Sequence, residues 1–174
     1  MSIRLRAGLG AYLFAACALP AAMSVSAQAP LPDALLAPGV HNAQRAWQHW
    51  VLNCQGCHRP DGTGSDATAP SIAGTVARFL HAPGGREYLG RVPGVATSPL
   101  ADADLAELLN WMLWRFDAAH IPADFHPYTP EELGRLRQQP LRVEASQVRS
   151  ALLKKAARPE ARGGGSSTPS LDSK

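Results

Sequence analysis

Two cysteines and a histidine lie within five residues of one another, at a spacing that suits covalent chemistry. Cys54 and Cys57 are separated by two residues, and His58 follows directly. This spacing lets both sulfurs reach the two vinyl groups along one edge of a haem and places the imidazole beneath the iron. Gly56 removes side-chain bulk where the backbone turns against the porphyrin. The motif therefore predicts one covalent haem c, attached at Cys54 and Cys57 and ligated by His58.

Three other uses of the cysteine pair compete with haem attachment. A thioredoxin-like redox pair would need a strand before it and a helix after it, whereas an amphipathic pattern precedes this pair and a glycine-rich stretch follows it. A zinc site would need a fourth ligand and usually a second cysteine pair, which the sequence lacks. A disulfide between Cys54 and Cys57 would close a loop too short to stabilise the fold much. The flanking sequence thus favours haem attachment.

The first 27 residues are typical of an export signal. Arg4 and Arg6 precede an apolar run over 7–22, and residues 25–27 offer the small side chains of a cleavage site. The apolar run is shorter than the roughly 20 residues that cross a bilayer, and Pro20 interrupts it. A lipoprotein signal at Cys17 fits the short preceding run less well. We predict cleavage near Ala27 and a periplasmic location, which leaves the mature chain with one cysteine pair.

Helices must position the motif, and the sequence indicates where they begin and end. Apolar residues recur at helical spacing behind Asn42, a suitable N-cap, so a helix is predicted over 42–53 that leads straight into the motif. Loops are predicted over 59–74 and 92–99, with short helical turns over 75–81 and 86–91. A longer helix is predicted over 102–116, with Asp102 and Asp104 in its first turn. Its apolar face would consist of Leu105, Leu108, Leu109, Met112, Leu113 and Phe116.

The C-terminal third is basic, and its composition suggests an appendage. Residues 129–132 have the form of a capping box, which predicts a short helix to about Gln138. A second, basic helix is expected over 143–157, and disorder from 158 onward. Residues 28–129 carry six basic and nine acidic side chains, whereas residues 130–174 carry nine and five. This imbalance is too weak to imply nucleic acid, but it suits docking on an acidic redox partner or contact with an anionic membrane surface.

The arrangement resembles the class I c-type cytochromes. In that family a helix runs into the haem motif, a loop follows, and a C-terminal helix crosses the first one beside the haem. Residues 42–53, 54–58, 59–74 and 102–116 take those places here. Pro70 resembles the family proline whose carbonyl supports the proximal histidine. The resemblance covers about residues 40–117 and implies an all-α fold: a small cytochrome c-like helical domain around a covalent haem, with a C-terminal helical and disordered extension.

The expected organisation has five parts. These are a signal peptide at 1–27, an extended arm at 28–40, a cytochrome c-like domain at 41–117, a helical extension at 118–157 and a disordered tail at 158–174. The resemblance implies single-electron transfer between redox partners such as a periplasmic dehydrogenase or oxidase. The sequence shows no pattern for substrate chemistry, so we expect an electron carrier rather than an enzyme.

The sixth iron ligand is the main departure from the family. The family usually supplies a methionine from the loop before the last helix, and residues 91–99 contain none. Met112 is better interpreted as core packing, and His81, at the end of a short helix, could swing over the distal face. His120 and His126 could fold back, while His49 is expected to face solvent. The alternative is an open sixth site, which would suit small-ligand binding, sensing or peroxidase-like chemistry.

Two further groups of residues could line the haem. The four tryptophans, Trp47, Trp50, Trp111 and Trp114, are predicted to pack around it and around the helix crossing. Arg86 and Arg91 could pair with the haem propionates through charge-assisted hydrogen bonds, or they could be solvated surface charges.

Overall fold

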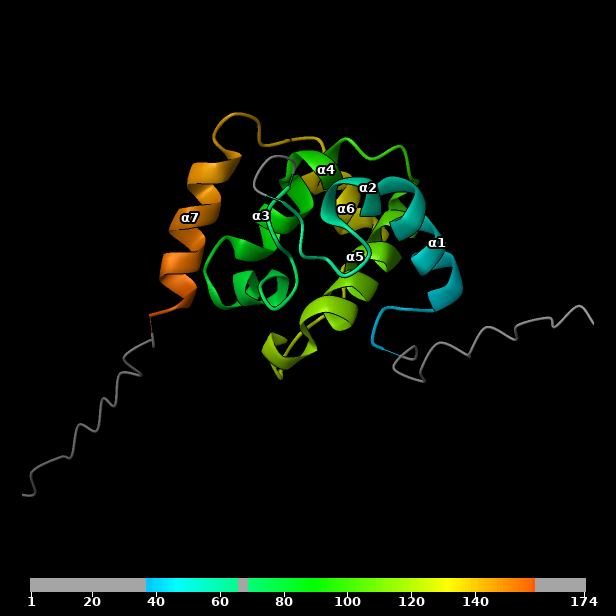
Figure 1. The fold of residues 1–174 in the computed structure, drawn as a ribbon, viewed down its shortest axis with the longest axis horizontal. Helices are drawn as coiled ribbons and strands as arrows, with labels where there is room; N and C mark the ends of the chain where they lie inside the picture. Colours follow the sequence, from blue (N-terminus) through cyan, green and yellow to red (C-terminus); the bar gives the residue numbers. More distant parts are fainter. Residues whose placement is uncertain (1–36, 66–68, 159–174) are drawn as a thin grey trace, which may run out of the picture. The chain divides into compact units, whose positions relative to one another are not determined.

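The computed structural model describes residues 37–65 and 69–158, and these residues form helices and turns (Figure 1). Their only strand-like pairing is a single bridge between Ser65 and Ala69. The all-α fold class is therefore confirmed. The predicted signal peptide, most of the predicted arm and the tail from 159 onward lie outside the described residues. Within the described part of the chain, no helix combines the length and apolar character needed to cross a membrane.

Nine helical elements follow one another along the described chain, two of them 3-10 helices (Figure 1). The elements are α1 (Ala43–Asn53), α2 (Gln55–His58), η1 (Val76–His81), α3 (Gly85–Arg91), α4 (Pro93–Ala96), α5 (Asp102–Asp117), η2 (Ala118–His120), α6 (Pro130–Leu136) and α7 (Ala145–Ala156). The predicted helices over 42–53 and 102–116 correspond to α1 and α5. The loop predicted over 92–99 instead contains α4, because Pro93 occupies the first helical position, where its fixed φ suits a helix.

Helix α1 begins where the sequence indicates. The Asn42 side chain accepts a hydrogen bond from the Arg45 backbone N–H at 2.9 Å, as expected for an N-cap. Ala43, Ala46 and Trp50 then face inward, and Trp50 is only 1% exposed. This buried stripe packs against α5, so α1 delivers the cysteine motif to one side of that helix.

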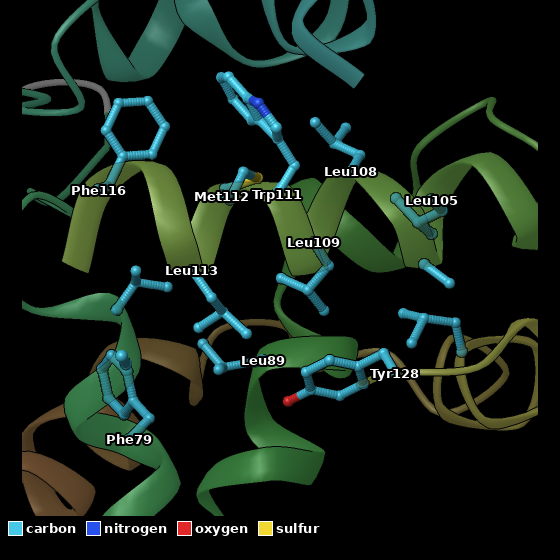
Figure 2. Close-up of a cluster of buried hydrophobic side chains, with 14 of the residues drawn as sticks. Phe79, Leu89, Leu105, Leu108, Leu109, Trp111, Met112, Leu113, Phe116 and Tyr128 are labelled. Carbon is cyan, nitrogen blue, oxygen red and sulfur yellow. The ribbon is translucent and has the colours of Figure 1, made fainter. Parts of the chain in front are cut away.

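Helix α5 is the central element of the fold. Figure 2 shows Leu108, Trp111 and Phe116 on the side that faces α1 and α2. Leu109 and Leu113 lie on the other side, toward Leu89, Phe79 and Tyr128. All of these side chains are buried in one hydrophobic cluster. The two sides of α5 therefore pack against different parts of the chain.

Three buried polar side chains on α5 fasten other segments to it, and sequence reasoning missed all three. Glu107 accepts hydrogen bonds from the backbone N–H groups of His41 and Asn42 at 2.7 and 2.6 Å. Asp117 accepts one from the Ala77 N–H at 2.8 Å. Asn110 is the third, and it binds two separate segments. The sequence did contain a signal for these contacts. A polar residue among the leucines of an apolar helix face is expected to be buried, and a buried polar group needs a hydrogen-bond partner.

Asn110 joins the two ends of the described core. Its side-chain amide donates to the backbone carbonyls of Gly39 and Tyr128, and its carbonyl oxygen accepts from the Tyr128 N–H at 2.9 Å. Gly39 has a φ of +79°, and a Cβ there would lie 2.4 Å from the Asn110 side-chain nitrogen. Only glycine fits this close approach.

The C-terminal helices contribute to the same core. Leu133 on α6 is fully buried, and Leu141 and Leu152 are nearly so. Helix α6 packs against α5 and α3, while α7 packs against η1 and α3. The segment suggested by its composition as an appendage therefore shares its hydrophobic cluster with α1 and α5.

The predicted capping box at the start of α6 is half formed. The Thr129 hydroxyl accepts from the Glu132 N–H at 3.3 Å, as predicted. The Glu132 carboxylate does not return to Thr129, because Arg86 binds it with two nitrogens, each at 2.6 Å. Arg86 also donates to the carbonyls of His126 and Pro127 and lies 4.0 Å from the centroid of the Tyr128 ring. Arg86 therefore links α3 to α6 and to the segment before it, rather than being a solvated surface charge. In the described structure it makes no contact with the cysteine motif.

Candidate haem site

The cysteine motif forms one helical turn at the end of α1. The backbone N–H groups of Cys57 and His58 both donate to the Cys54 carbonyl, at 3.1 and 3.0 Å. Residues three and four positions apart lie on the same side of a helical turn. The fold therefore places Cys54, Cys57 and His58 on one side, as a cofactor bonded to all three requires.

The Cys54 thiol lacks the lowered pKa of a reactive redox pair. No disulfide joins Cys54 to Cys57. Cys54 is partly buried, and burial, with a smaller contribution from Cys57, raises the pKa of its thiol to about 11. Thiol–disulfide enzymes depend on a cysteine pKa that is lowered instead. This difference argues against the thioredoxin-like alternative.

His58 is held in a state suitable for binding a metal. Burial lowers the pKa of its imidazole, and the Pro70 carbonyl beside it partly opposes that shift. A metal-bound histidine must be neutral, so the net direction fits. Its buried Nδ1 has no hydrogen-bond partner among the described residues. Metal-binding histidines usually direct the second ring nitrogen to such a carbonyl, so Nε2 is the nitrogen that would bind iron.

The loop after the motif brings Pro70 to His58 through its glycines. The Gly64 N–H donates to the His58 carbonyl at 2.9 Å. Gly64 has a φ of +63°, and a Cβ there would lie 2.2 Å from the Ala69 carbonyl oxygen and 2.9 Å from that of Pro70. A side chain at position 64 would therefore push the Pro70 segment away from the imidazole.

Aromatic rings form the wall behind His58. The Trp50 ring lies 6.1 Å from the His58 ring, 4.6 Å from Phe116 and 6.3 Å from Trp111, centroid to centroid. The buried indole N–H of Trp50 has no hydrogen-bond partner among the described residues. An unpaired buried donor costs free energy, so this position would gain from a bound group that pairs with the indole N–H. Apolar rings, an imidazole and two thiols on one side fit a covalent haem.

The other two tryptophans do not lie in this cluster. Trp47 is 38% exposed. The Trp114 ring is 6.5 Å from that of Phe125, on the chain segment that follows α5. The prediction that all four tryptophans surround the haem is therefore too broad, and Trp50 and Trp111 are the two that pack beside the motif.

The candidates for a sixth ligand are engaged elsewhere or buried. His81 is exposed, and its Nε2 lies 2.8 Å from the His120 carbonyl oxygen. His120 itself pairs with the buried Asp117 carboxylate. Met112 is buried in the hydrophobic cluster on α5, which agrees with its interpretation as packing.

The remaining histidines and Arg91 can also be placed. His49 does not face solvent as predicted, because its Nε2 is buried and lies 3.8 Å from Asp104 on α5. Its position on α1 flanks the stripe that packs on α5, which the helical wheel alone could not reveal. His41 and His126 are exposed. Arg91 donates to the Gln139 carbonyl at 2.7 Å, so the structure uses it to hold the segment after α6.

Comparison with known proteins finds relatives of this chain. No model of a protein family matches the sequence. A cytochrome c-552 of Thermus thermophilus is 33% identical over 125 residues, which cover 62% of this chain and 84% of that protein. A second Thermus thermophilus cytochrome c-552 is 34% identical over 106 residues, covering 51% of this chain and 81% of that protein.

With such similarity over most of the relative's length, this chain belongs to the c-type cytochromes. Membership implies a covalently bound haem c. The 125-residue match is longer than the stretch 40–117 that the sequence resemblance covers.

Proposed function

We propose that this protein is an exported electron carrier with a single haem, attached at Cys54 and Cys57 and ligated by His58. The observation that carries the proposal is the helical turn at the end of α1, which sets both thiols and the imidazole on one side. The Pro70 carbonyl beside the second ring nitrogen supports the same assignment. When bound, the haem supplies an iron centre that gains and loses one electron.

The residues around the motif would divide the work of holding this group. Cys54 and Cys57 would hold it covalently, and the neutral imidazole of His58 would supply a nitrogen ligand to its iron. Trp50 and Phe116 exclude water from the inner side, since both are buried. Cys57 is exposed, so the attached edge would lie near the surface, where a partner protein can approach it.

The direct test uses protein matured in a host able to attach haem to cysteines. The intact mass should equal the chain from Gln28 onward plus one haem, which tests attachment, haem number and signal cleavage together. A protein that carries no haem would refute the proposal. A haem-bearing protein that retains residues 1–27 would refute only the predicted cleavage.

The second candidate function is small-ligand binding at an open sixth site of the iron, and the positions of two histidines favour testing it. His49 and His81 both have other polar groups near their Nε2 atoms, and neither lies in the described aromatic cluster around His58. Ferrous protein should therefore be exposed to carbon monoxide. An unchanged low-spin spectrum supports the electron carrier, whereas rapid binding supports the alternative of a small-ligand site.

We also propose that α7 docks on an acidic surface of the redox partner. Exposed basic side chains on and beside this helix outnumber acidic ones: Arg142, Lys154, Lys155 and Arg158 are exposed, and Glu144 is the one acidic residue over 142–158. Such an imbalance speeds association with a surface of opposite charge, and salt screens the effect.

Charge reversal tests docking better than truncation, because Leu133 and Leu152 are part of the core. The double variant Lys154→Glu/Lys155→Glu should slow reduction by the partner at low ionic strength, with little difference at high salt. The matched variant Glu144→Lys should speed it. Equal rates for all three proteins would refute docking through α7, and binding of the wild type to anionic vesicles alone would assign the surface to a membrane.

A further inference from the structure

Helix α7 reaches back to the loop that holds His58. The Arg149 side chain on α7 donates from Nη2 to the Ser71 carbonyl oxygen at 3.2 Å, between residues 78 positions apart. Ser71 directly follows Pro70, which lies against Gly64, and the Gly64 N–H donates to the His58 carbonyl at 2.9 Å. A single side chain of the C-terminal helix therefore touches the segment that supports the proximal ring.

Arg149 is itself held in place by the core. Its guanidinium lies 5.8 Å from the centroid of the Phe79 ring, which packs against Tyr88 at 4.8 Å. On the same helix Leu152 is buried, and Val148 packs against the hydrophobic cluster. A guanidinium anchored in this way has lost much of its rotamer freedom, so its hydrogen bond to Ser71 can restrain the loop.

The Pro70 segment is tied to α5 at its far end, where the Gly74 N–H donates to the Phe116 carbonyl at 2.9 Å and Ile72 packs against the hydrophobic cluster. The Ser71 hydroxyl bonds only within the loop, to the carbonyls of Gly62 and Ala73 at 3.5 and 3.4 Å. Gly64, also in the loop, donates its N–H to the His58 carbonyl and lies against Pro70. Bonds of this kind move with the loop, whereas Arg149 ties it to a separate helix.

We infer that Arg149 is a positioning residue of the haem site, which holds the Ser71 peptide so that the Pro70 carbonyl stays against His58. This inference rests on the proposed function. A partner on the second ring nitrogen raises the basicity of a ligating imidazole, and a more basic ligand favours ferric iron. Loosening the loop should therefore raise the reduction potential. Loss of the positive charge alone would lower the potential, since a nearby cation disfavours the oxidised state.

The test compares holoproteins that carry Arg149→Met, Arg149→Lys or Arg142→Met with the wild type. Methionine keeps an apolar stem for packing on Phe79 but removes the donor and the charge. Arg142 is exposed, so Arg142→Met is the matched control for charge loss. Haem attachment is first checked by mass. The reduction potential and the exchange rate of the His58 Nδ1 proton are then measured by spectroelectrochemistry and NMR.

R149M should keep its haem, show a higher potential and exchange the ring proton several-fold faster. R149K should recover part of both effects. R142M, which loses only an exposed charge, should show a potential equal to or slightly below that of the wild type and unchanged ring exchange. A lower or unchanged potential with unchanged ring exchange in R149M would overturn the inference, even if its melting temperature falls. Should R149M give no holoprotein, Arg149→Gln is measured in the same way and judged by the same outcomes. A wild type without haem would instead refute the proposed function.

Discussion

The two sides of α5 differ in the side chains that pack against them and in whether the buried polar groups have hydrogen-bond partners. On the side of Leu109 and Leu113, leucines pack with the rings of Phe79 and Tyr128 (Figure 2). Tyr128 there donates its hydroxyl to the Arg86 carbonyl at 2.8 Å, and burial raises the pKa of that phenol, which keeps it neutral. On the side of Trp111 and Phe116, the Trp50 N–H and His58 Nδ1 are buried without a full hydrogen bond.

This difference shows which part of the core the polypeptide completes by itself. The aliphatic side, which we define by Leu109, Leu113, Leu89 and Tyr128, needs nothing beyond the chain. The aromatic side, which we define by Trp50, Trp111 and Phe116, retains the unpaired Trp50 N–H and packs against the imidazole that would bind the cofactor. We therefore expect the two sides to respond differently when haem is withheld.

Removal of both attachment sites should have the largest effect. A Cys54→Ser/Cys57→Ser variant should carry no covalent haem after expression in a maturing host, because both thioether bonds are gone. Its aromatic side should lose fixed packing while the aliphatic side stays protected, since only the former depends on the cofactor.

Near-ultraviolet circular dichroism and amide hydrogen exchange measure these two responses. The tryptophan signal should collapse, and amides of α1 should exchange much faster than those at the Leu109 and Leu113 turns of α5. Uniform exchange across both sides would contradict the division of the core.

A cavity on the aliphatic side should cost stability directly. Leu133→Ala should lower the free energy of unfolding by about 2–5 kcal/mol, because Leu133 is fully buried. Leu52→Ala is the control: Leu52 is 79% exposed, and its loss should change stability by less than about 0.5 kcal/mol. Chemical denaturation of both holoproteins gives the values. Equal stability of the two variants would place α6 outside the cooperative core.

Glu107 links α1 to α5 by charge and should give an acid-dependent effect. Burial alone would raise the pKa of this carboxyl, but hydrogen bonds from Arg45 and from the Asn42 and His41 amides lower it overall. Since the folded state has the lower pKa, the stabilisation is present above about pH 4.3, the ordinary glutamate value. It is lost as the pH falls through the folded-state pKa.

Glu107→Gln should therefore lower the unfolding free energy at neutral pH by about 1.5–3 kcal/mol, the usual contribution of hydrogen bonds to a charged group. The difference from the wild type should shrink in acid, as measured by denaturation at neutral pH and in acid below the ordinary glutamate pKa. A difference that stays constant with pH would show that packing, not the carboxylate charge, matters at this position.

The smallest effect is expected at Met112. Met112→Leu roughly conserves volume in the core and should cost less than about 1.5 kcal/mol. The visible spectrum of the holoprotein should not change, because Met112 is interpreted as packing on α5. A change of spin state in this variant would instead identify the Met112 sulfur as an iron ligand.

Local signals allowed much of the helical framework to be predicted. Asn42 and Thr129 cap helices by accepting from the backbone N–H three positions later, and both caps formed as expected. The Arg86–Glu132 pair could not be predicted in this way, because its members are 46 positions apart. Long-range pairing also changed the outcome of the capping box, since Arg86 binds the carboxylate that the box would use.

The candidate site also has features that local sequence predicts and features that depend on long-range contacts. The spacing of the motif was sufficient to single out Cys54 and His58, because the relevant geometry is confined to one helical turn. The distinction between Trp50 and Trp47 depends on how α1 meets α5, and sequence periodicity does not fix that contact. The role of Arg149 was not anticipated, because nothing local relates α7 to Ser71.

The bonds of Asn110 have a consequence for when the chain can finish folding. One amide group binds both residue 39 and residue 128, so its full set of partners exists only in a chain that extends at least to Tyr128. A polypeptide that ends with α5 could still hold its leading segment through Glu107 and the Gly39 carbonyl. It would leave the carbonyl oxygen of the Asn110 side chain inside the protein without the Tyr128 N–H.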